Sequence, residues 1–310
     1  MIPPWIAIAG PTGTGKSELA VALAERLGGE IVNYDSVQIY RGFDIGSAKP
    51  DTALRSRLPH HLFDIVDADE EFSAADFARA AAAVCADIER RGRRPVLVGG
   101  TGFYLRALLA GLPEMPGRDE ALRARLRRLL ETNRGRERAH RWLERVDAES
   151  ASRIAAADRH RLERALEVWI LTGRPISSWR RPTGATPIRP ACRIALSLPR
   201  EELSARLDRR VAEMYAAGLV EETRALLARY PSSARPFGAI GYAEAAAVVR
   251  TDLDREAAIA RTQRRTRNYA KRQMTWLRAE RDMHWVDART PPEERLEQAL
   301  GIVGTCDGHS

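Results

Sequence analysis

The chain has 310 residues, of which 44% are hydrophobic and 30% charged, and its formal net charge is +8. That length suffices for one large domain or two smaller ones, and the charge suits a polyanionic partner, although solubility alone would also account for it. The three cysteines, Cys85, Cys192 and Cys306, form no CxxC pair and no zinc-binding cluster, so we expect reduced thiols in a cytoplasmic protein. No apolar run approaches the roughly 20 residues of a membrane span, and the first residues lack the basic region of a signal peptide.

Lysine is rare in this chain. Three lysines, Lys16, Lys49 and Lys271, stand among 50 basic residues, which leaves 47 arginines. A coding bias toward arginine explains the imbalance, and the remaining lysines are candidates for positions that need a compact ammonium rather than a planar guanidinium.

The first predicted elements are a strand, a glycine-rich loop and a helix. Ile6–Ala9 is a short apolar run that is typical of a buried parallel strand. The pattern GxxxxGK[ST] follows, and apolar residues then recur at helical spacing as far as Leu27, before Gly28 and Gly29. This context predicts a phosphate-binding loop (P-loop) that consists of Gly10, Pro11, Thr12, Gly13, Thr14, Gly15, Lys16 and Ser17.

Each part of this loop has a physical role in binding phosphate. The glycines let backbone N–H groups point inward, and the helix N-terminus adds partial positive charge. Lys16 supplies a mobile ammonium, and the Ser17 hydroxyl is a candidate ligand for Mg²⁺, the cofactor that we expect. ATP as an occupant of the loop stays an alternative, since the pattern is shared with nucleotide-binding proteins.

The next two strands place a carboxylate and a hydroxyl beside the loop. Glu30–Tyr34 is followed by Asp35, and Pro95–Val98 is followed by Gly-Gly-Thr101-Gly, without the Asp that nucleotide hydrolysis normally needs there. Because the ends of neighbouring parallel strands meet at one edge, we expect Asp35 and Thr101 near the P-loop. This set suits a reaction in which diphosphate leaves and a weak nucleophile loses a proton to Asp35. Either residue could instead cap a helix or form a turn.

The rest of the chain divides into a helical insertion and a returning core. An arginine-rich helical pattern runs from Arg118 to about Leu171, and prolines and glycines then break it before residue 190. We therefore expect an α/β fold with a P-loop-type parallel sheet flanked by helices, formed by residues 1–117 and 191–310. A strand at Ile194–Leu198 rejoins the sheet, and residues 118–190 form a helical insertion domain.

Positive charge is concentrated in two segments. Residues 118–181 hold 17 Arg against 10 Asp and Glu, and residues 261–281 hold seven Arg and one Lys against one Glu, so each carries +7. Charged runs are usually solvated helix faces, which describes much of 118–150, whereas 261–281 has almost no acidic partners. Its basic face is a candidate surface for RNA phosphates. Tyr269 and Trp276, seven residues apart, are predicted to pack in the core.

Several blocks of the sequence resemble one known family. The blocks GPTGTGKSELA, EIVNYDSVQIYRGFDIGSAKP, VGGTGFYLRALLAGL, FGAIGYAE and AKRQMTWLR occur in this order over about residues 5–280. They are similar to the bacterial tRNA dimethylallyltransferases, also called tRNA isopentenyltransferases. Many families share the P-loop, but DSVQIYRG, GGTGFYLRAL and AKRQMTW together are highly specific for this one.

The resemblance implies the transfer of a dimethylallyl group from dimethylallyl diphosphate to tRNA. The acceptor is the exocyclic amine of the adenine directly 3′ of the anticodon, in tRNAs that read codons beginning with U. By similarity, the P-loop holds the diphosphate with Mg²⁺, Asp35 is the general base, Thr101 contacts the adenine and Arg210 binds the diphosphate. We expect a monomer that binds the anticodon stem-loop.

The resemblance also assigns tRNA contacts to several segments. The matching residues are Asp35, Ser36, Val37, Gln38, Thr101, Arg123, His160, Arg161, Leu162, Glu163, Arg164, Gly238, Ala239, Ile240, Gly241, Tyr242, Ala243, Lys271, Arg272 and Arg278. The family often has a different polar residue at His160, so the resemblance does not define the contact made there.

Three other functions fit parts of this pattern. An adenylate isopentenyltransferase acting on free nucleotide shares the P-loop, Asp35 and Thr101, but it does not need the two basic segments. A P-loop kinase of small molecules would turn over nucleotide and use Asp35–Gln38 to bind its acceptor hydroxyl. In a non-catalytic RNA-binding protein the P-loop would be structural, and Lys16 and Arg210 would be dispensable along with Asp35 and Thr101.

Overall fold

The computed structural model describes residues 4–113, 115–179, 191–280 and 282–308. The chain divides into two compact units, one formed by residues 1–110 with 187–310 and the other by residues 111–186. The first boundary follows Ala110, the last residue of a helix, and so precedes the predicted boundary at residue 117. Residues 180–190, which contain the predicted second boundary, lie outside the described part of the chain, as does Arg281.

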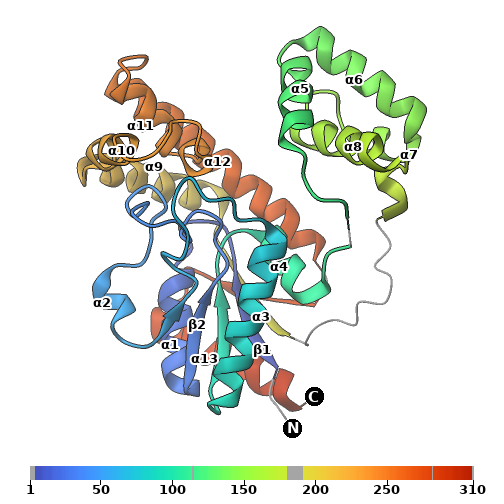
Figure 1. Cartoon of the computed structure of the whole chain (residues 1–310). Helices are drawn as coiled ribbons and strands as arrows, with labels where there is room; N and C mark the ends of the chain where they lie inside the picture. The colour runs from blue at the N-terminus through green and yellow to red at the C-terminus, as the bar shows by residue number, and fades with distance from the viewer. Residues whose placement is uncertain (1–3, 114, 180–190, 281, 309–310) are drawn as a thin grey trace. The chain divides into compact units, whose positions relative to one another are not determined.

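The larger unit is built on a six-stranded sheet with the strand order β3-β2-β4-β1-β5-β6 (Figure 1). Every neighbouring pair in this order is parallel, which confirms the predicted α/β class. The predicted strand around Ile194 returns beside the first strand, with Ile194 opposite Ile8. The strands are β1 (Trp5–Ala9), β2 (Gly29–Asn33), β3 (His60–His61), β4 (Arg94–Val98), β5 (Ala191–Ser197) and β6 (Met283–Asp287).

Helices cover the sheet, since its central strands must be kept from water. The strands β1, β2 and β4 are buried at every residue, which is the pattern of parallel strands covered on two faces. The helices of this unit are α1 (Lys16–Leu27), α2 (Thr52–Arg55), α3 (Ala74–Arg90), α4 (Gly102–Ala110), α9 (Arg200–Ala216), α10 (Leu219–Leu227), the 3-10 helix η2 (Arg235–Gly238), α11 (Tyr242–Val249), α12 (Arg255–Ala279) and α13 (Pro292–Gly308).

Local residues determine where two of these helices end or begin. The helix α1 ends at Gly28, whose left-handed backbone conformation stops the helix as the Gly-Gly pair predicted. At the start of α3, the hydroxyl of Ser73 accepts a hydrogen bond from the Asp76 amide, and the Asp76 carboxylate accepts one from the Ser73 amide.

The smaller unit is helical and has a core of its own. Its elements are α5 (Glu120–Leu130), α6 (Asn133–Val146), α7 (Ala148–Ala151), α8 (Arg159–Thr172) and the 3-10 helix η1 (Ile176–Trp179). Its buried apolar side chains include those of Leu126, Leu143 and Leu166. These three leucines come from three different helices, so each of those helices contributes to one core.

A buried ion-pair network also joins α5 to α8. The fully buried Glu167 accepts hydrogen bonds from Nε of Arg123 at 2.7 Å and from Nη1 of Arg164 at 2.6 Å. Burial opposes ionisation of this carboxyl, but the two guanidinium groups outweigh it and lower the pKa of Glu167 to about 2.

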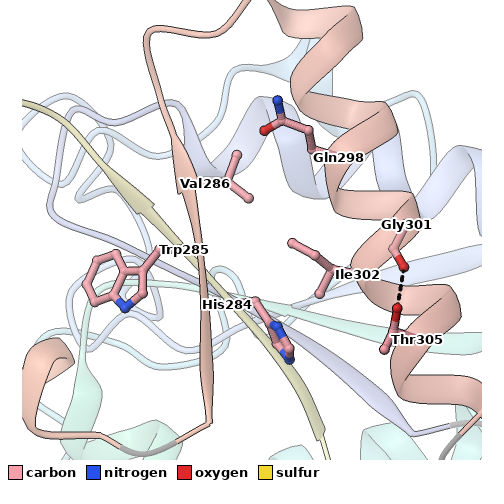
Figure 2. Close-up of a pocket in the computed structure, with 7 residues that line it drawn as sticks. All are labelled: His284, Trp285, Val286, Gln298, Gly301, Ile302 and Thr305. Atoms are coloured by element: carbon pink, nitrogen blue, oxygen red, sulfur yellow. Dashed lines mark hydrogen bonds between the residues drawn. The ribbon is translucent and has the colours of Figure 1, made fainter.

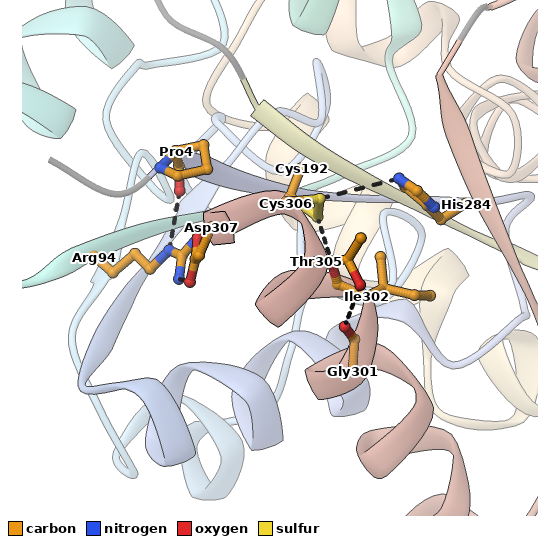
Figure 3. Close-up of a disulfide and its surroundings, with 9 residues drawn as sticks. All are labelled: Pro4, Arg94, Cys192, His284, Gly301, Ile302, Thr305, Cys306 and Asp307. Atoms are coloured by element: carbon orange, nitrogen blue, oxygen red, sulfur yellow. Dashed lines mark hydrogen bonds and ion pairs between the residues drawn. A yellow bond between two sulfur atoms is a disulfide. The ribbon is translucent and has the colours of Figure 1, made fainter. Parts of the chain in front are cut away.

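The expectation of three reduced thiols was wrong. Cys192 on β5 and Cys306 on α13 form a disulfide across a sequence separation of 114 residues, with their Cα atoms 5.8 Å apart (Figure 3). Cys85 is a free, buried thiol. Cysteine spacing could not reveal the pair, because only the packing of α13 against β5 brings the two sulfur atoms together. Close by, Arg94 binds the carboxylate of Asp307 through both terminal nitrogens, at 2.9 and 2.7 Å.

A groove of about 430 Å³ lies between β6 and α13 (Figure 2). Its lining residues are His284, Trp285, Val286, Gln298, Gly301, Ile302 and Thr305. None of them belongs to the predicted site, so the groove is not where the predicted chemistry takes place. Among the helices of the described residues, none has the length and hydropathy needed to cross a lipid bilayer.

Candidate active site

The candidate site lies at the carboxyl edge of three neighbouring strands. In the sheet β4 lies between β2 and β1, so the segments that follow these strands meet. Asp35 follows β2, the Gly99–Thr101 segment follows β4, and the P-loop follows β1. A carboxylate oxygen of Asp35 lies 3.3 Å from the position that a Cβ of Gly100 would take. Lys16 of the P-loop is close enough for its charge to lower the pKa of Asp35.

The P-loop has the backbone conformation that an anion-binding loop needs. Gly13 and Gly15 both have a φ of +82°, which favours glycine over any residue with a side chain. Gly15 is the N-cap of α1 and supplies no side-chain cap to that helix. Because the first N–H groups of a helix have no intrahelical acceptor, those of α1 can bind an anion.

Lys16 is held inside the loop, and its pKa is lower than that of an ordinary lysine. Its Nζ donates a hydrogen bond to the carbonyl of Pro11 at 2.8 Å, and so spans the loop. Burial and then the nearby charge of Arg210 lower the pKa of Lys16 to about 8. A bound diphosphate would oppose both effects, since it would supply the negative charge that the free site lacks.

The helix α9 brings two arginines to the loop. Nη1 of Arg210 donates to the hydroxyl of Thr12 at 3.2 Å, and Nη1 of Arg206 donates to the carbonyl of Gly13 at 3.3 Å. Burial lowers the pKa of Arg210 from its ordinary value. Arg210, predicted as a diphosphate ligand, therefore lies where a phosphate held by the P-loop would meet it, and Arg206 is a neighbour that the sequence did not single out.

Asp35 is a partly buried carboxylate with a fixed orientation. One of its carboxylate oxygens accepts hydrogen bonds from the amides of Val37 at 2.9 Å and Gln38 at 3.4 Å. Burial raises the pKa of Asp35, and these hydrogen bonds together with the charge of Lys16 oppose the rise. A carboxylate that is more basic than usual and held in place is suited to accept a proton.

Thr101 joins two of the strand ends through its hydroxyl. The oxygen accepts a hydrogen bond from the Ser36 amide at 3.0 Å, and the hydroxyl donates to the Ser36 hydroxyl at 3.1 Å. Next to it, Nε2 of Gln38 donates to the carbonyls of Ser47 and Ala48. The Asp35–Gln38 segment is thus fixed by its own turn and by Thr101, which leaves the site ordered before any substrate arrives.

Residues on α12 that the sequence reasoning did not assign to the site hold it together. Gln273 accepts a hydrogen bond from the Thr12 amide at 3.0 Å and donates to the carbonyl of Gly100 at 2.9 Å, so it connects the P-loop to the end of β4. Its place inside the AKRQMTW block is the sequence signal that could have identified it. The hydroxyl of Tyr269 also donates to the carbonyl of Gly100, at 3.2 Å.

The aromatic pair on α12 lines the site instead of packing in the core as predicted. Tyr269 and Trp276 are both partly exposed. A Cβ at Gly102 would lie 2.6 Å from the Trp276 ring, so the ring contacts the start of α4 directly. A small pocket at this point is lined by Ala9, Gly10, Tyr34, Gly99, Gly100, Gln273, Trp276 and Leu277.

The donor atoms at the loop fit a magnesium ion. Ser17 is partly buried in the first turn of α1, and the Asp35 carboxylate lies close enough to Lys16 for each charge to affect the pKa of the other residue. Mg²⁺ prefers oxygen ligands and is commonly bound by one or two protein oxygens together with phosphate oxygens and water. A hydroxyl and a carboxylate beside an anion-binding loop form such a set.

The predicted tRNA contacts fall into exposed and buried groups. Leu162 and Tyr242 are fully buried, and each lies in a hydrophobic core. Arg123 is engaged by Glu167, and Glu163 is itself buried. Gly241 is buried as well. The exposed members are His160, Arg161, Gly238, Lys271, Arg272 and Arg278. The partly exposed members are Asp35, Ser36, Val37, Gln38, Thr101, Arg164, Ala239, Ile240 and Ala243. The exposed side chains are the ones available to an RNA, and the two buried apolar ones support the backbone of their segments.

Comparison with protein-family models finds two matches. Residues 38–280 match the IPP transferase family, and residues 5–60 match the isopentenyl transferase family. The first match covers more than half of the chain, from the residue after Val37 to the end of α12.

Curated relatives are similar over nearly the whole chain. The tRNA dimethylallyltransferase of Anaeromyxobacter sp. (strain Fw109-5) is 50% identical over 91% of this chain and 93% of its own length. The tRNA dimethylallyltransferase of Solibacter usitatus is 49% identical over 97% of this chain and 98% of its own length.

Solved structures have the same fold over most of this chain. The full-length tRNA isopentenylpyrophosphate transferase from Bacillus halodurans is 35% identical, with a TM-score of 0.71 over 98% of this chain and 97% of that one. A eukaryotic dimethylallyltransferase acting on tRNA is 29% identical, with a TM-score of 0.73 over 92% of this chain and 74% of that one. On these matches, and on a P-loop site that fits a diphosphate, the chain belongs to the IPP transferase family.

Proposed function

We propose that this protein is a tRNA dimethylallyltransferase that uses dimethylallyl diphosphate as the donor. The acceptor is the exocyclic amine of the adenine directly 3′ of the anticodon, in tRNAs that read codons beginning with U. The observation that carries the proposal is the position of Asp35, a basic and oriented carboxylate beside a loop that can hold a diphosphate. The tRNA dimethylallyltransferases that resemble this chain over nine tenths of its length support the same reaction.

The leaving group is stabilised by the P-loop and its basic neighbours. The N–H groups of the α1 N-terminus, Lys16 and Arg210 surround the place where a diphosphate binds. Their positive charge favours the charge that develops on the diphosphate as its bond to the allylic carbon breaks. Mg²⁺, held through the Ser17 hydroxyl, would supply further neutralisation of the diphosphate when bound.

The acceptor amine needs help from a base because its lone pair is delocalised into the adenine ring. In the transfer, a bond forms between the amine nitrogen and the allylic carbon, and the carbon–oxygen bond to the diphosphate breaks. The proton lost from the nitrogen passes to the Asp35 carboxylate, whose raised pKa makes it a better acceptor than an ordinary Asp. Thr101, whose hydroxyl lies beside Ser36, would contact the adenine.

The choice of tRNA over free adenylate rests on the positive charge of the chain. Lys271, Arg272 and Arg278 are exposed on α12, the helix whose Gln273 and Tyr269 contact the site. Exposed cations next to the acceptor site suit the phosphates of an RNA loop whose target base is unstacked and drawn into a pocket. A free nucleotide would need no such surface.

Mass spectrometry of unmodified tRNA, incubated with the protein, Mg²⁺ and dimethylallyl diphosphate, tests the proposal. The expected result is one nucleoside heavier by a dimethylallyl group, next to the anticodon. Product with free adenylate but not with tRNA would move the assignment to an adenylate isopentenyltransferase. No product with either acceptor would overturn the transfer and return the P-loop to nucleotide chemistry.

A further inference from the structure

The C-terminal helix α13 carries a buried arginine in its first turn. Arg295 is 9% exposed, and its Nη1 donates a hydrogen bond to the carbonyl of Ala288 at 3.0 Å. The amide of Ala288 in turn donates to the carbonyl of Ser197, at the end of β5, at 2.8 Å. These hydrogen bonds fix the guanidinium beside the end of β5, at the same edge of the sheet as the active site.

The guanidinium of Arg295 faces the P-loop. The point where a Cβ of Gly15 would lie is 3.7 Å from Nη1 and 3.9 Å from Nη2 of Arg295. Gly15 is the N-cap of α1, whose first N–H groups are the core of the anion-binding loop. The helices α1 and α13 lie side by side (Figure 1) and share one hydrophobic cluster, to which α1 contributes Leu23 and α13 contributes Ala299.

Arg295 lacks a counterion within the described part of the chain. Its Nε is buried without a hydrogen-bond partner, and the described residues form no ion pair with it. A carboxylate oxygen of Glu18 lies 3.8 Å from the same Cβ position of Gly15, but Glu18 is exposed and forms no ion pair with Arg295. A buried charge costs free energy unless an opposite charge compensates it.

We propose that the diphosphate of the donor is the counterion of Arg295. In that role Arg295 is a further donor-binding residue, supplied by the C-terminal helix in addition to Lys16 and Arg210. The inference rests on the proposed function, since it requires that the P-loop binds the diphosphate of the donor. It assigns to α13 a part in donor binding that no motif of the sequence indicated.

The affinity for inorganic pyrophosphate in the presence of Mg²⁺, measured by calorimetry, tests this role without requiring turnover. Arg295→Met is the variant, and Arg289→Met is the matched control, because Arg289 is exposed and already paired with Asp287. We expect Arg295→Met to bind pyrophosphate at least about tenfold more weakly, with a shallower dependence of affinity on salt, while Arg289→Met binds as the unaltered protein does. Equal affinity of the unaltered protein and Arg295→Met would overturn the inference.

Two further measurements separate a charge effect from a loss of structure. Without pyrophosphate, Arg295→Met should melt no lower than the unaltered protein, because the substitution removes a buried charge without a partner. Arg295→Lys, which keeps the charge, should restore part of the affinity, and failure of that rescue would make Arg295 a packing residue only. In the transfer reaction the KM for the donor should rise while the KM for tRNA stays unchanged. An unaltered protein that binds pyrophosphate in this way but transfers nothing would refute the proposed function and leave the anion role of Arg295 intact.

Discussion

Two side chains at the site have shifted proton affinities that match their proposed roles. Burial raises the pKa of Asp35, which makes it a better base, and lowers the pKa of Lys16 to about 8, which makes its charge conditional on pH. Each shift is partly opposed by the other residue, because the two charges are opposite and close. The few lysines of the chain include two whose ammonium groups are buried, as expected for positions that need a compact cation. Lys49 is a second buried ammonium, with Tyr40, Asp44 and Asp64 supplying its acceptors.

Replacing Asp35 by Asn should abolish catalysis while the fold becomes more stable. The amide oxygen can still accept the hydrogen bonds from Val37 and Gln38, but the side chain can no longer take a proton. We expect the rate of transfer to fall at least about 100-fold, as for the loss of a general base, with tRNA affinity retained.

The Asp35→Asn substitution should increase the stability of the fold at neutral pH. Because the folded-state pKa of Asp35 is raised, the folded state favours the protonated carboxyl. The contribution of the protonated Asp35 carboxyl to the stability of the fold is complete at low pH, and it is lost as the pH rises through the folded-state pKa. At neutral pH the variant should therefore melt at a higher temperature than the unaltered protein. A normal transfer rate in the variant would remove Asp35 as the base, and a lower melting temperature would contradict the effect of burial.

Donor affinity should fall as the pH rises through about 8. The free protein loses the proton of Lys16 in that range, so binding of a diphosphate at higher pH requires uptake of a proton. Calorimetric titration with pyrophosphate in two buffers of different ionisation enthalpy, at pH 8.5 or above, should reveal this uptake. Lys16→Arg should bind more weakly, because a planar fork cannot replace a compact ammonium in the loop, and its affinity should vary less with pH. Equal affinity in Lys16→Arg would refute the point-charge role of Lys16.

Three helices far from the P-loop in the sequence complete the site. The helix α9 contributes Arg210, α12 contributes Gln273, and α13 contributes Arg295. Each is positioned by its own packing: Leu207 of α9 and Ala270 of α12 belong to the same hydrophobic cluster as the strands of the sheet. The first 110 residues therefore supply the loop and the base, and the returning part of the chain supplies most of the cations.

The disulfide between β5 and α13 should stabilise the fold measurably. Closing a loop of more than 100 residues restricts the unfolded chain and is worth about 4–5 kcal/mol in the chain-entropy treatment. We expect urea to unfold the oxidised protein at a higher concentration than the reduced protein, and Cys306→Ser to behave like the reduced protein with or without reductant. Unfolding curves that do not respond to reductant would show that the bond does not form in solution.

Cys85 should stay unmodified in the native state, because burial raises the pKa of its thiol to about 12.

At the scale of the whole molecule, some basic side chains are paired with acidic residues of the protein, and others are exposed without such a pair among the described residues. Some arginines of the segment 261–281 are engaged inside the protein: Arg265 pairs with Glu244, and Arg267 pairs with Asp208. The sum of +7 therefore overstates the charge that this segment offers to an RNA. Within the part of the chain that the structure describes, fewer than seven of these cations are exposed and unpaired near the site. The affinity for tRNA should depend on the number of these exposed cations and not on the net charge of the segment.

The affinity for tRNA should decrease steeply with salt. Each phosphate neutralised by a Lys or Arg releases counterions, so the logarithm of the affinity falls linearly with the logarithm of the salt concentration. Substituting Lys271, Arg272 and Arg278 by Gln should make that slope shallower by about two to three. Substituting Arg79, Arg90 and Arg153, exposed arginines that are each paired with an acidic residue three or four positions earlier, should leave it unchanged. A flat salt response of the unaltered protein would exclude this surface as the docking face.

The sequence by itself determined the local part of the active site and the class of the fold. The P-loop, the strand ends that carry Asp35 and Thr101, and the helix ends at Gly28 and Ser73 depend on short-range backbone geometry, which neighbouring residues specify. The family resemblance further named Arg210, and the structure places that residue at the loop.

Only the tertiary structure decided which distant residues meet. The Cys192–Cys306 bond, the place of Gln273 between the P-loop and Gly100, and the approach of Arg295 to Gly15 all join residues more than 100 positions apart. The cores that bury Leu162 and Tyr242 are likewise formed by side chains from several helices or loops. Such contacts depend on how helices pack against a finished sheet, and packing is a collective property of many side chains that no single motif encodes.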